Sequence, residues 1–231
     1  MAVQRQALNA ASMHRKRDLA SASHAVDWNF GVPLGGASQG RLVLERETPD
    51  VVVSADSRLS ALALARFDGE MPETITSDGT LTVRYAGRGI TAWLHHALRS
   101  PRAQLVLNAG IPWFLDLRGG IHRLAANLRQ LPLAGIDMHG GVHRAELWLP
   151  QPTGTVRIRV ASGVNRLAIH RHPETAMRLS LRGGVSSLQI DGAEAGAIAG
   201  DIRRATPDWA TAPDRYDVMV SGGANQVLVT E

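Results

Sequence analysis

The ten residues "LDLRGGIHRL" at positions 115–124 are nearly repeated 21 residues later as "IDMHGGVHRA". Five such copies align on a shared glycine, and the steps between successive glycines are 21, 22, 21 and 39 residues. These reference glycines are Gly120, Gly141, Gly163, Gly184 and Gly223. A repeat of this kind is typical of stacked units, because one unit cannot bury its apolar face alone. The repeat therefore predicts a fold built from successive turns of similar shape.

Within each copy, apolar and polar residues alternate around the glycine. In the first copy, Leu115 and Leu117 alternate with Asp116 and Arg118, and this period of two predicts a strand with one buried face. Glycine suits a corner between strands because it tolerates positive φ and close backbone approach. Each unit is therefore predicted to contain a strand, a glycine corner, a second strand and a shorter third strand. Prolines punctuate that third segment at Pro132, Pro150, Pro152 and Pro173.

The predicted fold class is all-β, a single-stranded β-solenoid (β-helix) with turns of about 21 residues and a narrow aliphatic core. The solenoid domain is expected over residues 41–231, and residues 1–40 are interpreted as a polar N-terminal tail or cap. The long step between Gly184 and Gly223 predicts an excursion of the chain over residues 192–217.

One segment has helical rather than strand-like spacing, and it predicts a short amphipathic helix near residues 90–99. Its apolar face would carry Trp93, Leu94 and Leu98, which are candidate partner-binding residues. We expect this face to pack against the solenoid itself. The alternative is that the helix lies on a membrane surface, because arginines flank it.

Composition excludes several classes of site and partner. The chain has no cysteine, which excludes disulfides, thiolate catalysis and Cys-ligated zinc. Its formal net charge is +4, and its arginines are scattered without interleaved aromatic residues, so no nucleic-acid partner is expected. No apolar run reaches the roughly 20 residues of a membrane span. The first residues lack the apolar core of a signal peptide. We therefore expect a cytoplasmic soluble protein.

Four stretches carry a resemblance to a known group: "LVLNAGIPWFLDLRGG", "LPQPTGTVRIRVASG", "MRLSLRGGVSSLQIDG" and "DRYDVMVSGGANQVLV". On these stretches the chain resembles the bacterial toastrack or putative-adhesin type of glycine-rich β-solenoid domain, over roughly residues 41–231. The resemblance implies a solenoid fold. It implies no catalytic residues, because the group has no catalytic signature that could be carried over to this chain. The histidines that follow the glycines depart from the plainer members.

Equivalent residues of successive turns stack about 4.8 Å apart in a solenoid, so columns matter more than linear motifs. The second position after the glycine holds His122, His143, Asn165, Ser186 and Asn225 in successive copies. Two stacked imidazoles suggest a metal site, because histidine is a common ligand of transition metals. We prefer a hydrogen-bonded ladder of polar side chains, with His122 and His143 as candidate ligand-binding residues. No metal and no cofactor are predicted.

The third position holds Arg123, Arg144 and Arg166 in the first three copies. Three stacked guanidinium groups would form a positive stripe, which could bind phosphate, carboxylate or an acidic polysaccharide. In the simpler interpretation, the arginines pair with Glu146 and nearby acids and keep the face soluble.

Asp116 and Asp137 occupy one column before the glycine. Carboxyl groups about 5 Å apart are typical of a retaining glycosidase, but Arg159 follows in the same column and offers Asp137 an ion pair. A flat strand face also lacks a cleft. The chain has no Ser-His-Asp order, phosphate loop or dinucleotide motif, so we predict that it is not an enzyme.

These observations predict a non-enzymatic scaffold or protein-interaction module. Terminal turns of a solenoid expose strand edges that must be capped or paired. The C-terminal residues 218–231 have no visible cap, so we expect them to pair with another copy, a partner protein or the 192–217 excursion. A protein partner or a homo-oligomer is therefore expected. The alternatives are binding or cleavage of acidic glycans along the arginine stripe, and a membrane-stress regulatory module.

Overall fold

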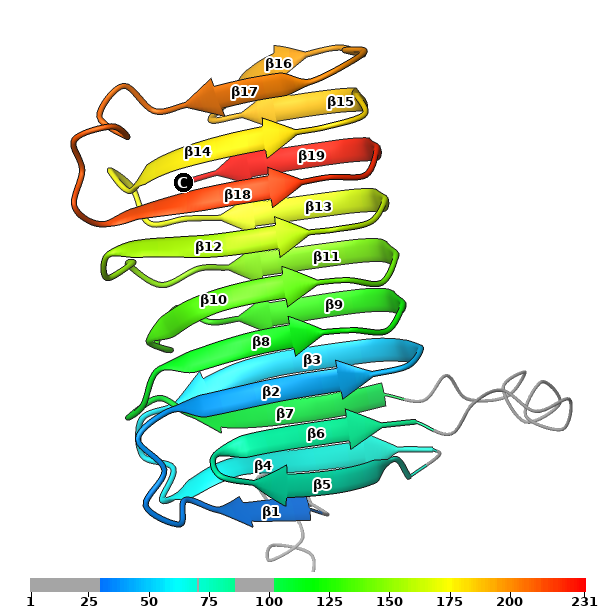
Figure 1. Cartoon of the computed structure of the whole chain (residues 1–231), viewed down its shortest axis with the longest axis vertical. Helices are drawn as coiled ribbons and strands as arrows, with labels where there is room; N and C mark the ends of the chain where they lie inside the picture. The colour runs from blue at the N-terminus through cyan, green and yellow to red at the C-terminus, as the bar shows by residue number, and fades with distance from the viewer. Residues whose placement is uncertain (1–29, 70, 86–101) are drawn as a thin grey trace, which may run out of the picture.

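The computed structural model describes residues 30–69, 71–85 and 102–231 (Figure 1). These residues form β-strands and connecting loops, with no helix among them. The all-β prediction is therefore confirmed for this part of the chain. The helix predicted near residues 90–99 lies outside the described residues, together with its Trp93, Leu94 and Leu98.

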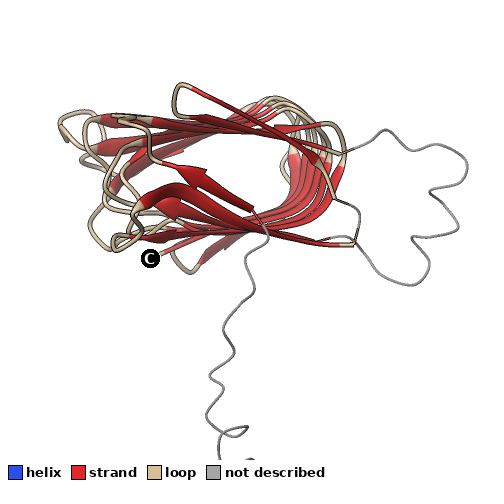
Figure 2. Cartoon of the chain, turned by 90° about the horizontal axis from the view of Figure 1, so that it is seen from below, coloured by secondary structure: helices blue, strands red, loops and turns tan. Residues whose placement is uncertain are grey.

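The strands form two sheets that face each other across the core (Figure 2). Sheet A has ten strands in the spatial order β1 (Phe30–Pro33), β4 (Ala61–Asp68), β7 (Arg102–Asn108), β3 (Thr48–Asp56), β9 (Ile121–Asn127), β11 (Val142–Trp148), β13 (Val164–His170), β19 (Ala224–Thr230), β15 (Val185–Ile190) and β16 (Ala193–Ala195). Sheet B has nine strands in the order β17 (Ile202–Ala205), β14 (Ala176–Leu181), β18 (Arg215–Val220), β12 (Thr155–Val160), β10 (Leu133–Met138), β8 (Trp113–Leu117), β2 (Gly40–Glu45), β6 (Thr80–Arg84) and β5 (Glu73–Ser77). Sheet A thus begins with β1, before residue 41.

Each regular turn contributes one strand to each sheet, joined by a glycine corner on one side and a loop on the other. The chain runs from β8 through the corner into β9, and residues 128–132 then lead to β10. The third strand predicted for each turn is therefore wrong. Pro132 lies in this loop and Pro150 in the next one, and proline lacks the N–H that a sheet interior requires. Leu128 and Leu131 are fully buried and close this side of the core.

The reference glycines lie in single file, as the repeat predicts, but not in the order of the sequence. The residues that follow them pair along sheet A in the order Ile121, Val142, Val164, Ala224 and Val185. The turn of Gly223 therefore lies between the turns of Gly163 and Gly184. The β-solenoid prediction holds, with one turn placed out of sequence.

The C-terminal strands are enclosed by the chain's own turns. β18 pairs with β12 and β14, and β19 pairs with β13 and β15. The end that the sequence suggested would seek a partner is thus paired on both sides. The chain first builds β14 and β15, adds β16 and β17 as antiparallel strands, and then returns to fill the skipped turn (Figure 1). At the other end, β4 and β5 pair antiparallel with β7 and β6.

The core between the sheets is mainly aliphatic, as the composition predicts. Its two largest fully buried side chains are Trp113 and Tyr216. Their polar groups donate to backbone carbonyls, Trp113 Nε1 to Asn108 O at 2.8 Å and Tyr216 Oη to Pro150 O at 2.8 Å. Such bonds remove the cost of burying an unpaired donor. The inner faces of both sheets are therefore occupied by the core, and the polar side chains of the strands lie mainly on the outer faces.

Candidate functional site

The outer face of sheet A presents two exposed columns of side chains beside the glycine corner. In β9, His122 and Arg123 lie exposed between the buried Ile121 and Leu124. The parallel register repeats this arrangement in the adjacent strands. The structure therefore brings together all five candidate ligand-binding residues: His122, His143, Arg123, Arg144 and Arg166.

The first column is a polar ladder made of His122, His143, Asn165 and Asn225, and Asp50, which is in register with Arg123, contacts its first member. The rings of His122 and His143 stack with their centroids 5.1 Å apart. His122 Nδ1 lies 3.3 Å from Asp50 Oδ1, and Asn165 Nδ2 donates to His143 Nδ1 at 3.1 Å. Asn225 Nδ2 donates in turn to Asn165 Oδ1 at 2.9 Å. The hydrogen-bonded ladder expected from the sequence is present.

The second column, which we call the arginine ladder, consists of Arg123, Arg144 and Arg166. Arg144 is paired in register with both of the others, on β9 and β13. Arg123 Nη1 lies 3.8 Å from Asp50 Oδ2. Among the described residues, Arg144 and Arg166 have no acidic partner, and the buried Nε of Arg144 has no hydrogen-bond partner. The ladder is therefore a stack of like charges that meets an acid only at its Arg123 end, where Asp50 lies in register.

Glu146, the acid expected to pair with these arginines, is engaged elsewhere. Its Oε1 lies 3.3 Å from His170 Nε2, and His170 Nδ1 lies 2.7 Å from the Thr230 hydroxyl. The expected pairing of the arginine ladder with Glu146 is therefore absent. His170 also stacks on Trp148, with ring centroids 5.2 Å apart and an interplanar angle of 17°.

Trp148 is a site residue that the sequence reasoning missed. It lies on β11 with Arg144, four residues further along the same strand. Because side chains in a strand alternate between the two faces, Arg144 and Trp148 project from the same outer face. The sequence alone therefore predicts that these two side chains share a face. The face thus combines a row of guanidinium groups with a partly exposed aromatic ring.

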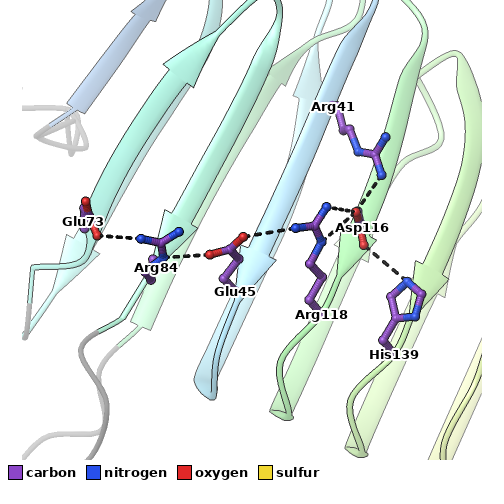
Figure 3. A network of polar contacts seen from close by, with 7 residues as sticks. All are labelled: Arg41, Glu45, Glu73, Arg84, Asp116, Arg118 and His139. Carbon is purple, nitrogen blue, oxygen red and sulfur yellow. Dashed lines mark hydrogen bonds and ion pairs between the residues drawn. The ribbon is translucent and has the colours of Figure 1, made fainter.

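The outer face of sheet B carries a network of seven side chains in which opposite charges alternate (Figure 3). Its members are Arg41, Glu45, Glu73, Arg84, Asp116, Arg118 and His139. Arg84 bridges Glu73 and Glu45, at 3.3 and 2.7 Å. Arg118 bridges Glu45 and Asp116, at 3.2 and 3.0 Å. Every arginine of this network therefore has an acidic partner.

Asp116 is the buried centre of the sheet B network. Its side chain is only 3% exposed, and its Oδ2 accepts from Arg41 Nη2 at 2.7 Å and from Arg118 Nε at 3.0 Å. Burial acts to raise the pKa of Asp116, but the hydrogen bonds from the two arginines outweigh it, and the pKa lies below its ordinary value. The carboxyl group therefore remains ionised at neutral pH.

Asp116 and Asp137 are neighbours in register on β8 and β10, as the column predicts. Each has its own cationic partner, and Arg159 Nε lies 3.8 Å from Asp137 Oδ1. A retaining glycosidase needs one carboxyl group that holds a proton. Asp116, held ionised by two arginines, is therefore not the proton donor of such a pair.

Two features of the described residues concern the metal site and the membrane contact that the sequence left open. In the described part of the chain, no group of three or more His, Asp or Glu side chains is placed to hold a metal ion. No helix of the described residues has the length and apolar character needed to cross a membrane.

Two pockets lie at the ends of the stack, away from both ladders. A pocket of about 520 Å³ lies between the loop of residues 34–39 and the β5–β6 hairpin. A second pocket, of about 470 Å³, is lined by residues of β14, β15, β16 and β17, together with Arg171. The ladders themselves lie on an open sheet face, which suits an extended ligand better than a small enclosed one.

Comparison with known proteins supports the fold. No protein-family model matches the sequence, and no curated protein sequence matches it. Among solved structures, the chain is similar to a "putative cell adhesion protein" from Clostridium sporogenes, with a TM-score of 0.67 and 16% sequence identity. The alignment covers 87% of this chain and 96% of that one. The resemblance to bacterial adhesin-type β-solenoids is thus confirmed at the level of the fold.

Proposed function

We propose that the chain is a non-enzymatic binding module of the adhesion type, which holds an acidic glycan on the outer face of sheet A. The observation that carries this proposal is the arginine ladder. Arg123, Arg144 and Arg166 stand on three consecutive strands, and the last two have no acidic partner among the described residues. The description of the Clostridium sporogenes protein as an adhesion protein agrees with a binding role.

Stacked arginines carry a cost that a bound anion removes. Like charges directly opposite each other on neighbouring strands destabilise a sheet by up to about 1 kcal/mol. The sheet B network avoids this cost by alternating charges, so the fold itself does not impose it. A guanidinium group binds carboxylate or sulfate through two parallel hydrogen bonds. An anion placed between two arginines would therefore replace repulsion with attraction.

The geometry favours a polymer with repeated negative charges. Neighbouring guanidinium groups are anchored about 4.8 Å apart along the stack, so one ligand contacts several of them only if it extends across the strands. Trp148 adds a partly exposed ring on the same face, and aromatic rings pack well against the apolar faces of other rings. These features match a polysaccharide of uronic acid or sulfated sugars.

Direct binding tests the proposal. The full chain is titrated with polygalacturonate, with heparin and with neutral dextran, and affinity is measured by calorimetry at low and at physiological salt. We expect both acidic polymers to bind, with an affinity that falls as salt rises, and dextran not to bind. The double variant Arg144→Gln/Arg166→Gln is expected to lose at least about tenfold in affinity, because two charged contacts disappear.

The matched control is Arg157→Gln/Arg182→Gln, which removes the same charge from two exposed positions, one on β12 of sheet B and one directly after β14. We expect this control to bind within about twofold of the parent protein. Equal losses of affinity in the two double variants would show that binding depends on the net charge of the protein and not on the arginine ladder. Failure of both acidic polymers to bind would contradict the proposal.

A further inference from the structure

The four terminal strands of the two sheets differ in how well their free edges are protected. β1 ends in Pro33, which has no N–H, and β16 has only three residues. β17 carries the exposed Arg203 and Arg204. Proline, short length and charged side chains are the usual means of keeping a sheet edge from pairing. β5 uses none of them over residues 74–77.

β5 has the composition of a strand that pairs readily. Its five residues read "ETITS", and β-branched residues are favoured in strands. Ile75 of β5 and the nearby Met71 are 43% and 59% exposed. They are two of the three exposed large apolar side chains among the described residues. Within the described part of the chain, the outer edge of β5 therefore combines unpaired backbone groups with exposed apolar surface.

The hairpin that joins β5 to β6 shows which backbone groups face outward. Its two loop residues, Asp78 and Gly79, both have positive φ, 46° and 76°, as in a two-residue type I′ turn. In such a hairpin, Ser77 and Thr80 form the hydrogen-bonded pair next to the turn, and the pairs then alternate. The N–H and C=O groups of Thr74 and Thr76 therefore point away from β6, toward the free edge.

The two sheets end at different levels beside β5. Beyond β3, sheet A continues with β7, β4 and β1, whereas beyond β2, sheet B continues only with β6 and β5. In Figure 1, β1 lies beyond β5 at the end of the stack. The pocket of about 520 Å³ lies beside this step, and Val32, Leu62 and Thr76 line it. A strand added to β5 would bring sheet B level with sheet A.

We propose that the free edge of β5 accepts an extended basic segment of a partner protein as an added strand of sheet B. Backbone bonds to Thr74 and Thr76 supply the attachment, and the neighbouring pocket takes one side chain of the segment.

The described residues 71–79 contain two acids, Glu73 and Asp78, and no base. Glu73 contacts Arg84 at 3.3 Å but is 58% exposed, and Asp78 has no cationic partner among the described residues. Basic side chains therefore complement this edge. Two β5 edges of the same protein would instead bring like charges together, which disfavours a second copy of the chain.

The probe is a synthetic peptide with blocked ends, Lys-Val-Thr-Val-Lys-Val-Thr-Val-Lys, titrated into the full chain. Amide hydrogen exchange is measured residue by residue, and affinity by calorimetry. We expect bound peptide to slow exchange of the Thr74 and Thr76 amides at least about tenfold, because those groups become hydrogen-bonded. The analogue with glutamate in place of lysine is expected to bind at least about tenfold more weakly.

Thr76→Pro removes one outward N–H without removing a β5–β6 hydrogen bond, and we expect it to weaken peptide binding about tenfold. Thr76→Val keeps the N–H and should bind like the parent protein. A peptide N-methylated at alternate valines tests the same bonds with the protein unchanged, and it should also bind about tenfold more weakly. Unchanged affinity for this peptide, or no protection at Thr74 and Thr76, would overturn the proposal. A dimer of the free chain that protects these two amides would also overturn it.

Discussion

The same turns of the solenoid build two outer faces that arrange charge in opposite ways. On sheet B, positive and negative side chains alternate across the strands, as in the run Glu73, Arg84, Glu45, Arg118 and Asp116. On sheet A, the arginine ladder places three like charges on consecutive strands. A repeat copies residue types along the stack, so like charges meet unless the repeat is broken. On sheet B like charges still meet at Asp116 and Asp137, but each has an arginine partner. On sheet A the arginine ladder keeps its column, and two of its three members have no acidic partner among the described residues.

This difference indicates where a ligand should be sought. The sheet B network satisfies its charges internally and contributes to stability. The arginine ladder holds uncompensated charge on an open face, which favours an anion from outside the chain. Changes on sheet B should therefore act on stability, and changes on sheet A should act on binding.

The largest effect is expected at the corner that joins the two faces. A Cβ at Gly119 would overlap the backbone carbonyl oxygen of Arg46, whereas a Cβ at Gly120 would stand 3.6 Å from the carbonyl oxygen of Gly141. We expect Gly119→Ala to lower the free energy of unfolding by at least about 3 kcal/mol, because backbone must move to admit the methyl group. Gly120→Ala should cost about 1 kcal/mol or less. Urea denaturation compares the two, and equal losses would contradict the close packing at the first glycine.

The next effect concerns the centre of the sheet B network. Asp116→Asn removes the charge that holds Arg41 and Arg118 together, and we expect it to lower the free energy of unfolding by about 2 kcal/mol. The two arginines are about half exposed, at 48% and 50%, so water relieves part of the cost. Asp137→Asn, whose partner is 3.8 Å away, should cost less than about 0.5 kcal/mol. Similar losses in the two variants would show that the buried network around Asp116 is no more stabilising than the surface ion pair of Asp137.

The pH dependence of stability also tests how much the ion pairs of Asp116 contribute. Because the folded-state pKa of Asp116 lies below its ordinary value of 3.8, its contribution is present above that value. It is lost as the pH falls through the lower folded-state value. Between about pH 5 and about pH 2.5, the parent protein should therefore lose more stability than the Asp116→Asn variant. Parallel stability curves, measured by urea denaturation, would show that Asp116 contributes no such linkage.

The smallest expected change in stability compares one arginine from each face. Arg118→Gln breaks contacts to Asp116 and Glu45, and we expect it to lower the free energy of unfolding by about 1 kcal/mol. Arg144→Gln removes a charge that faces only like charges, so it should leave stability unchanged or raise it by about 0.5 kcal/mol at low salt. Added salt should abolish this gain. A loss of stability in Arg144→Gln would show that an unrecognised contact holds this arginine.

The repeat alone predicts the stacking of the turns and the columns of His122 and Arg123, because register follows from the period of the glycines. It does not predict that Gly223 lies between Gly163 and Gly184. The residues after Gly163 and Gly184 resemble those after Gly223, so local pattern fits either order. Only the pairing of both sheets at once decides that the chain skips a turn and returns.

The charge contrast also could not be predicted from the sequence. The ion pair between Arg41 and Asp116 joins residues 75 positions apart, and it depends on β2 lying beside β8. The engagement of Glu146 by His170 depends on the register of β11 and β13. The position of Trp148 could have been predicted, because alternation along one strand places it on the face that carries Arg144.

Thermal unfolding at low salt, with and without polygalacturonate, tests most directly whether the arginine ladder is a site for anionic ligands. A ligand that binds the native state raises the Tm. A ligand concentration about ten times the Kd corresponds to a rise of roughly 3–5 °C for a chain of this size. We expect such a rise for the parent protein and for Arg157→Gln/Arg182→Gln, and a rise of at most about 1–2 °C for Arg144→Gln/Arg166→Gln, because its binding is at least about tenfold weaker. A rise of equal size in all three proteins, or in none, would contradict the proposal.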